Sequence, residues 1–404
     1  MSGVRVLEVA QFTFTPAAGA VLADWGADVI KVEHAVTGDA QRGLQIGTGG
    51  IAQGSFQPLM EHPNRGKRSI GLVLENPAAR QVLLELARDS DVFLTNFLPG
   101  ARRRLGIEVE DLRLANPDII YVRGSAHGPR GPEAGRGGYD SSIFWSRSGS
   151  AMGATPPDSP RVIDMPAGAY GDSMGGMTIA GGIAAALFAR HRTGTPSVVD
   201  VSLLALGAWA TALSVNNALL TGDVPPVPPL TSASANGFNP IIGNFRTSDN
   251  RWINLTMLQA GRYWADVCRH LDREDLIEDE RFDSAEKLMA RATEAGQLVA
   301  EAFAAKPYAY WLEKLQTLEG QWAPNNNAVE VGQDPQVRAN QYIVPVVDAE
   351  GTERELVASP VQFDECAPTI SRAPQFAEHT DDVLRELGRT EDEILQLKID
   401  GAVT

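Results

Sequence analysis

The first half of the chain alternates short apolar runs with segments that repeat apolar residues at helical spacing. Residues 4–10 and 27–33 are apolar and β-rich, and residues 17–25 between them follow a threonine and a proline that start a helix. A strand, a helix and a strand in this order predict a βαβ unit with parallel strands. The same alternation continues in strands expected at 67–74, 91–97, 119–122 and 197–201. It predicts an α/β fold built on a parallel sheet.

Residues 168–194 predict the helix around which this fold is organised. Asp172 stands where the helix should begin, small and apolar residues follow, and a basic last turn precedes Gly194. An acidic start and a basic end followed by glycine are helix boundary signals. The many Gly and Ala residues let other backbones come close, so we expect this helix to be buried. From its residue type alone, Asp172 is an N-cap carboxylate that binds free N–H groups.

A change of composition at residues 225–229, Pro-Pro-Val-Pro-Pro, predicts a stiff linker and a domain boundary. A long apolar helix is expected just before it, at 202–220. We therefore expect a large domain in residues 1–224 and a smaller domain in residues 225–325. The tail, 326–404, returns to strand patterns at 343–347 and 355–357 and then to an amphipathic helix at 381–386.

Composition excludes several classes of partner and cofactor. The net charge of −16 argues against nucleic acid. No run approaches the ~18 apolar residues of a membrane span, and the N-terminus lacks a signal-peptide pattern. Two cysteines and six scattered histidines lack metal-ligand spacing, so no metal is expected. The turn after residues 4–10 has no G-x-G-x-x-G, which argues against NAD and FAD. We expect a cytoplasmic protein.

Short stretches in order along nearly the whole chain resemble the class III CoA-transferase family. They are residues 26–33, 38–42, 67–70, 96–100, 171–177, 192–194, 334–337, 378–381 and 386–388. Any one stretch is a weak match, but their number and order are specific. The resemblance implies a Rossmann-like large domain built from both ends of the chain, with a smaller α+β domain inserted. It also implies an interlocked homodimer.

By the same resemblance, the activity is transfer of CoA between an acyl-CoA thioester and a free carboxylic acid, with no permanently bound cofactor. Asp172 falls on the family's nucleophilic aspartate, which forms an anhydride and then an aspartyl-CoA thioester. A helix N-terminus stabilises negative charge, so the cap and nucleophile interpretations are compatible. Tyr139 and Asp140 match a tyrosine–carboxylate pair near the thioester, and Thr13 stands at the position of an active-site glutamine.

The resemblance also implies which residues contact CoA. Arg104 matches a CoA-contacting arginine, which would explain three arginines (102–104) in the first turns of one helix, where the macrodipole disfavours cations. Arg136 lies beside a position that is cationic in the family, whereas Arg68 could equally be a solvated charge at a strand edge. The full set is Phe14, His34, Arg42, Arg68, Leu72, Leu74, Asn96, Phe97, Arg104 and Arg136.

The acid that accepts CoA is expected to be larger and more apolar than formate or oxalate, because Phe12, Phe14 and Trp145 occur near the site residues. Loops at 40–62 and 230–245 are expected to set the pocket size. Three alternatives stay open: an acyl-CoA racemase, an intramolecular CoA shift, and a subunit of a hetero-oligomeric CoA-transferase. Tyr139 argues against the racemase, which has a histidine acid/base at that position.

Overall fold

The computed structural model describes residues 1–44, 56–230 and 237–404, and the chain divides into two compact units. The first unit combines residues 1–151, 164–216 and 335–404, and the second combines 152–163 and 217–334. A smaller unit is therefore inserted in a larger one that contains both ends of the chain. This division assigns residues 152–163 and 217–224 to the inserted unit, whereas the sequence analysis expected them in the large domain. The boundaries expected from sequence stay predictions.

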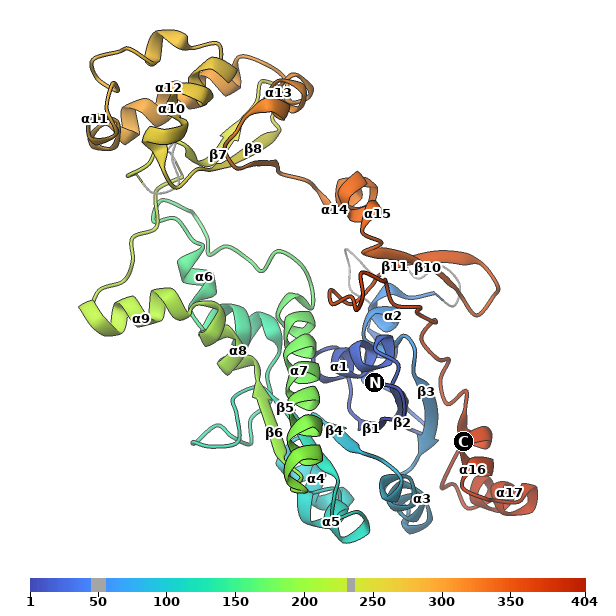
Figure 1. Cartoon of the computed structure of the whole chain (residues 1–404). Helices are drawn as coiled ribbons and strands as arrows, with labels where there is room; N and C mark the ends of the chain where they lie inside the picture. Colours follow the sequence, from blue (N-terminus) through green and yellow to red (C-terminus); the bar gives the residue numbers. More distant parts are fainter. Residues whose placement is uncertain (45–55, 231–236) are drawn as a thin grey trace. The chain divides into compact units, whose positions relative to one another are not determined.

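Six parallel strands form the sheet of the first unit, in the order β3-β2-β1-β4-β5-β6 (Figure 1). The order reverses between β1 and β4, as in doubly wound Rossmann-type sheets. The predicted α/β fold with a parallel sheet is confirmed. The strands are β1 (Arg5–Val9), β2 (Asp28–His34), β3 (Arg68–Leu72), β4 (Val92–Thr95), β5 (Ile120–Ser125) and β6 (Val198–Ser202).

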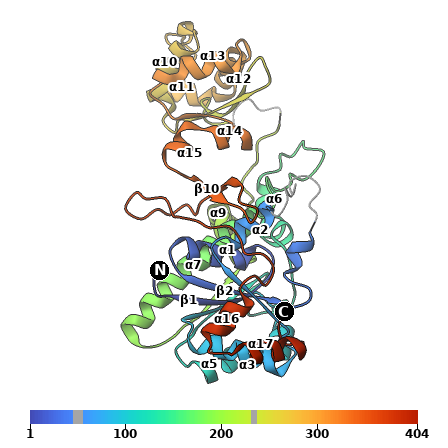
Figure 2. The ribbon, with the colours of Figure 1, turned by 90° about the vertical axis from the view of Figure 1, so that its right-hand side faces the viewer.

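Helices cover both faces of this sheet, because successive residues of a buried strand point to opposite sides. Val6 of β1 belongs to the core with α1 and α7, whereas Leu7 belongs to the core with α3, α5, α16 and α17. Figure 2 shows α16 and α17, from the C-terminal end, beside α3 and α5. The helices of this unit include α1 (Phe14–Asp24), α2 (Pro58–Asn64), α3 (Pro77–Arg88), α4 (Pro99–Leu105), α5 (Val109–Ala115), α7 (Tyr170–Thr193), α8 (Leu203–Ala210), α15 (Pro335–Ala339), α16 (Thr380–Glu386) and α17 (Glu391–Ile399).

Helix α7 packs on α1 through glycines. A Cβ at Gly176 would lie 2.4 Å from the Cβ of Ala17, so only glycine allows this approach. The helix expected to be buried is buried on one side only, since Met174 and Phe188 are exposed. The expected cap is wrong, because Ala169 is the N-cap residue, and the carboxyl that accepts from the first N–H groups of α7, those of Gly171 and Asp172, is that of Asp140. Asp172 instead lies in the first turn.

By length and composition, α7 could cross a membrane, and so could α8 and α9 (Ala212–Thr221) taken as one bent pair, when the described residues are searched. Core helices of soluble proteins pass the same test, and α7 packs against α1, β5 and β6. The single helix expected at 202–220 is broken, with a bend of 73° between α8 and α9. The break falls at Thr211, whose hydroxyl donates to the carbonyls of Gly207 and Ser148.

Smaller antiparallel sheets complete the chain. The predicted strands of the tail form a hairpin, β10 (Ile343–Val347) and β11 (Glu353–Val357), in the first unit. The second unit contains a three-stranded sheet with its own apolar core. Its elements include β7 (Ile242–Arg246), β8 (Trp252–Thr256), β9 (Trp322–Pro324), α10 (Ala260–His270), α11 (Ala285–Ala290), α12 (Ala292–Ala304), α13 (Tyr308–Lys314) and α14 (Ala328–Gln333). A short α6 (Ser150–Gly153) lies where the two units join along the chain.

Candidate active site

A cavity of about 520 Å³ opens in the first unit at the carboxyl ends of β1, β4 and β5. Its walls come from Phe12 and Phe14 after β1, residues 96–99 after β4, the glycine-rich loop after β5, and Asp172 of α7. The order of the strands reverses between β1 and β4. Ligands of open parallel sheets bind at this switch point. We call this space the main cavity.

Asp172 brings a largely buried carboxyl group to the main cavity. Burial, and then the nearby Asp140 carboxyl, raise the pKa of Asp172 to about 7. Burial also raises the pKa of Asp140, while the backbone N–H groups of Ser141, Asp172 and Gly171 oppose that rise. Two carboxyl groups in one dry environment resist double ionisation. Asp172 is thus poised between its protonated and ionised forms near neutral pH.

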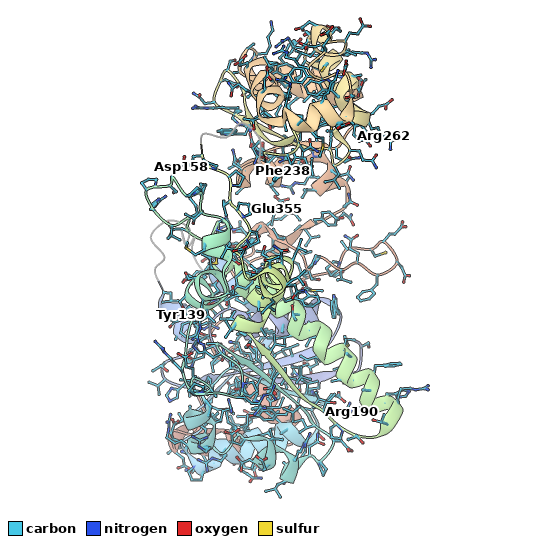
Figure 3. The ribbon with its side chains drawn as sticks, turned by 90° about the vertical axis from the view of Figure 1, so that its left-hand side faces the viewer. Tyr139, Asp158, Arg190, Phe238, Arg262 and Glu355 are labelled. Carbon is cyan, nitrogen blue, oxygen red and sulfur yellow. The ribbon has the colours of Figure 1, made fainter. Side chains whose placement is uncertain are left out.

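Aromatic rings line the cavity on the side of the β1 turn. The ring of Phe12 meets the ring of Tyr139 edge to face, with 5.6 Å between centroids and 86° between planes. Tyr139 is 63% exposed and lies at the edge of its unit (Figure 3). Phe14 is mostly core, because its ring fills the space beside Gly124 and Gly175 and only reaches the cavity wall.

Asn96 joins the ends of β1 and β4 at the switch point. Its side-chain oxygen accepts from Gln11 N–H at 3.0 Å, and its Nδ2 donates to Gln11 O at 2.6 Å. Thr13 is buried, and its hydroxyl donates to Gln41 Oε1 at 2.9 Å. Thr13 does not line the main cavity. Its predicted catalytic role stays a prediction.

A second cavity, of about 190 Å³, shares Phe97 with the main cavity. It brings together five of the residues that the sequence resemblance assigned to CoA: His34, Leu72, Leu74, Phe97 and Arg104. The His34 ring is oriented by Val36 N–H and Thr37 N–H, each 3.3 Å from Nδ1. We call this space the side cavity.

Two predicted cationic contacts lie outside both cavities. Arg42 is bound to Glu33 through Nε and Nη2, both at 2.7 Å. Arg68 lies at the opposite, amino end of the sheet, paired with Asp28 and Glu386. Their roles as CoA contacts stay predictions. Arg136 does line the main cavity, where it donates to Glu133 at 2.9 Å.

Three arginines of the main cavity received no role from sequence. Arg102 is bound to Glu108 and to the carbonyl of Phe97, and Arg123 makes a two-pronged pair with Asp200. Arg103 is exposed to the cavity, and its side chain makes no hydrogen bond or ion pair with any residue that the structure describes. The only sequence signal was the run of three arginines on one short helix.

A histidine that sequence reasoning missed supports the first turn of α7. His62 Nε2 lies 2.9 Å from Ser173 Oγ, and that hydroxyl donates to Ala169 O at 2.8 Å. Burial lowers the pKa of His62 to about 4, so the ring is neutral at pH 7. This contact fixes the backbone beside Asp172. The loops expected to set the pocket size fall in part on residues 45–55 and 231–236, which are outside the described residues.

Comparisons with known proteins identify the family of this chain. The family model "CoA-transferase family III" matches residues 1–380. A cinnamoyl-CoA:phenyllactate CoA-transferase of Clostridium sporogenes is 30% identical, over 99% of this chain and 96% of its own. An (R)-2-hydroxy-4-methylpentanoate CoA-transferase of Clostridioides difficile is 26% identical, over 98% of both chains. The crystal structure of a CAIB/BAIF family protein from Brucella suis superposes with a TM-score of 0.80, at 27% identity, over 96% of this chain and 98% of that chain. The chain therefore belongs to CoA-transferase family III and is an enzyme of that class.

Proposed function

We propose that this enzyme moves CoA between an acyl-CoA and a free carboxylic acid through covalent intermediates on Asp172. The observation that carries the proposal is a single, largely buried carboxyl at the start of α7, facing a cavity at the switch point of the sheet. A carboxylate with a raised pKa is a stronger nucleophile than an ordinary one while still ionised in part at neutral pH. The first N–H groups of α7 favour negative charge that develops beside it.

The reaction proceeds in four balanced steps and needs no proton transfer. An Asp172 oxygen attacks the thioester carbonyl, the C–S bond breaks, and CoA leaves as a thiolate. The thiolate attacks the Asp172 carbonyl of the anhydride, which releases the first acid and leaves an aspartyl-CoA thioester. The acceptor carboxylate attacks that thioester and again releases the thiolate. The thiolate then attacks the acceptor's acyl carbon and frees Asp172.

We place CoA across Phe97, with the adenosine end in the side cavity and the thioester near Asp172. The side cavity offers apolar walls and Arg104, and the main cavity offers Arg103 and Arg136. A pyrophosphate needs cations, and Arg103 has none of its charge neutralised by a described residue.

The acceptor is proposed to be an acid with an apolar chain. Phe12, Phe14 and Leu203 line the main cavity together with the exposed ring of Tyr139. The names of the two Clostridium and Clostridioides relatives specify phenyl-bearing and branched-chain acids. Turnover of oxalate as fast as of any bulky acid would argue against this part of the proposal.

A homodimer, interlocked as the family resemblance implies, is also proposed. Large apolar side chains of the first unit are exposed on consecutive helices: Phe188 on α7, Trp209 on α8 and Leu213 on α9. Exposed apolar surface of this kind is typical of an interface between chains. The cytoplasmic location stays a prediction.

Trapping of the intermediate tests the covalent route. Wild type and Asp172→Ala are incubated with a panel of acyl-CoAs and hydroxylamine, and intact masses are measured. Hydroxylamine converts an aspartyl anhydride or thioester into a stable hydroxamate, so wild type gains mass and the variant does not. No adduct, together with exchange of the substrate's α-proton in heavy water, would favour the racemase. Neither signal would favour a missing partner subunit.

Arg103→Gln is expected to raise KM for an acyl-CoA about tenfold with kcat nearly unchanged, because a charge-assisted contact to phosphate is lost. The matching acyl-pantetheine, which has no phosphates, should show no change. Arg88→Gln, at the exposed end of α3, is the matched control. Steady-state kinetics with both thioesters makes the comparison. An equal loss with both thioesters would assign Arg103 a structural role instead.

A further inference from the structure

Phe12 has a backbone conformation that a bulky residue seldom adopts. Its φ is +65°, in the left-handed region, although glycine would fit there without strain. Strained residues persist only where the surrounding structure holds them, and they concentrate at functional sites. Here the strain directs an aromatic ring into the wall of the main cavity, edge to face with Tyr139.

Every backbone polar group of the turn between Ala10 O and Phe12 N–H has a side-chain partner. Lys31 Nζ donates to Ala10 O at 3.0 Å, and Asn96 binds both the N–H and the carbonyl of Gln11. Asp39 Oδ1 accepts from Phe12 N–H at 3.1 Å. The turn is thus held at three successive residues.

Asp39 is itself held by a chain of fully buried charges. Its Oδ2 lies 2.8 Å from Lys31 Nζ, which also contacts Glu8 Oε1 at 3.2 Å. Glu8 in turn binds Lys67 at 2.7 Å, and these Lys and Glu side chains have no exposed surface. Lys31 therefore ties both ends of the turn, Ala10 directly and Phe12 through Asp39.

Stability alone does not account for this arrangement. Buried ion networks often contribute no more to folding than apolar residues of the same size, because their desolvation is costly. Such groups are retained in some proteins because they fix one geometry. The geometry fixed here is the left-handed turn at Phe12, which presents its ring to the cavity that holds Asp172.

We propose that Asp39, held by buried Lys31, is a positioning residue for acid specificity: it keeps the Phe12 ring in the cavity wall, where it packs against the apolar chain of the acid. This inference rests on the proposed function and names the device that selects the acid. Edge-to-face packing of aromatic rings is favourable beyond the effect of their burial. A ring that is free to turn away would lose this contact with the acid.

A double-mutant cycle tests the proposal. The readout is the ratio of kcat/KM for 3-phenylpropanoate to that for acetate as CoA acceptor. Phe12→Gly should lower this ratio about tenfold or more, since a site discriminates apolar groups by about that factor per group. Asp39→Asn keeps an oxygen for Phe12 N–H but removes the charge opposite Lys31, and should lower the ratio several-fold, mainly through KM for the aromatic acid.

The double variant decides between positioning and independent roles. Glycine needs no anchor at φ +65°. Asp39→Asn should therefore add almost nothing to the specificity loss of Phe12→Gly. A specificity loss in the double variant equal to the product of the two single losses would overturn the proposal. An unchanged ratio in Asp39→Asn would overturn it as well. If Asp39→Asn does not fold, Asp39→Glu, which keeps the charge but moves it by one methylene, is read in the same way.

Asp24→Asn is the matched control, because Asp24 forms an equally buried pair with Arg65 at 2.7 Å and does not contact Phe12. It should lower the melting temperature and leave the specificity ratio unchanged; an equal loss of specificity would reduce Asp39 to a structural role. Hydroxylamine trapping at Asp172 separates the two proposals. Trapping that persists in Asp39→Asn with an unchanged ratio rejects only the positioning role. Absence of trapping in wild type rejects the covalent function itself.

Discussion

Asp172→Asn is expected to abolish CoA transfer, with kcat lower by about 10³-fold or more, the scale seen when a covalent nucleophile is removed. The amide has the same shape as the carboxyl, but its oxygen and nitrogen do not attack a thioester. Initial rates with an acyl-CoA and an acceptor acid measure the loss. Asp382→Asn, in the exposed first turn of α16, is the control. A variant at position 172 that kept about a tenth of the activity would contradict the covalent route.

The substitution that removes activity should stabilise the fold relative to wild type as the pH rises. The pKa of Asp172 in the folded protein, about 7, lies above the usual aspartate value of 3.8. Between these values the folded state binds more protons than the unfolded state, so wild type loses stability as pH rises from about 4 to 7. Asparagine lacks this loss. The free energy of unfolding of the variant minus that of wild type, measured in urea, should therefore be larger at pH 8 than at pH 5.

The α/β fold could be predicted from sequence because its information is local. Apolar runs, a Thr-Pro helix start and a glycine after α1 specified strands and helices one at a time. The order of the six strands was not in these patterns. The family resemblance implied a Rossmann-like domain, and the order itself is seen only in the structure. The prediction of a cap at Asp172 was wrong because an aspartate near a helix start fits both a cap and a nucleophile. The structure shows that the helix begins after Ala169, which places Asp172 in the first turn and not at the cap.

The candidate site was harder to predict, since a charged residue looks the same whether its partner is a ligand or the protein. Arg42 and Arg68 have partners within the fold, Glu33 for the first and Asp28 and Glu386 for the second. Arg103, by contrast, faces the main cavity without such a partner among the described residues. Phe12 was noted only as an apolar residue near the site, and its left-handed backbone gave no signal, because that conformation is expected at glycine or asparagine and not at phenylalanine.

The activity of the wild-type enzyme should fall on the acid side of neutrality. Only the ionised Asp172 attacks a thioester, and its pKa is about 7. Below that pH, kcat/KM should drop about tenfold per pH unit as the ionised fraction falls. An ordinary aspartate would keep full activity down to about pH 5. A profile of kcat/KM from pH 5 to 9, with a thioester that is stable over this range, measures the midpoint.

Asp140→Asn should move this midpoint to lower pH. The Asp140 charge is one of the two causes that raise the pKa of Asp172, and the variant removes it while burial, the larger cause, remains. The midpoint should thus fall part of the way toward the usual aspartate value, and activity at pH 6, relative to each enzyme's own maximum, should rise. Glu133→Gln, a carboxyl that pairs with Arg136 and Arg147 and does not line the main cavity, should leave the midpoint in place. A midpoint that stayed or rose in Asp140→Asn would mean that this carboxyl does not repel the charge of Asp172, and that burial alone sets the acid limb.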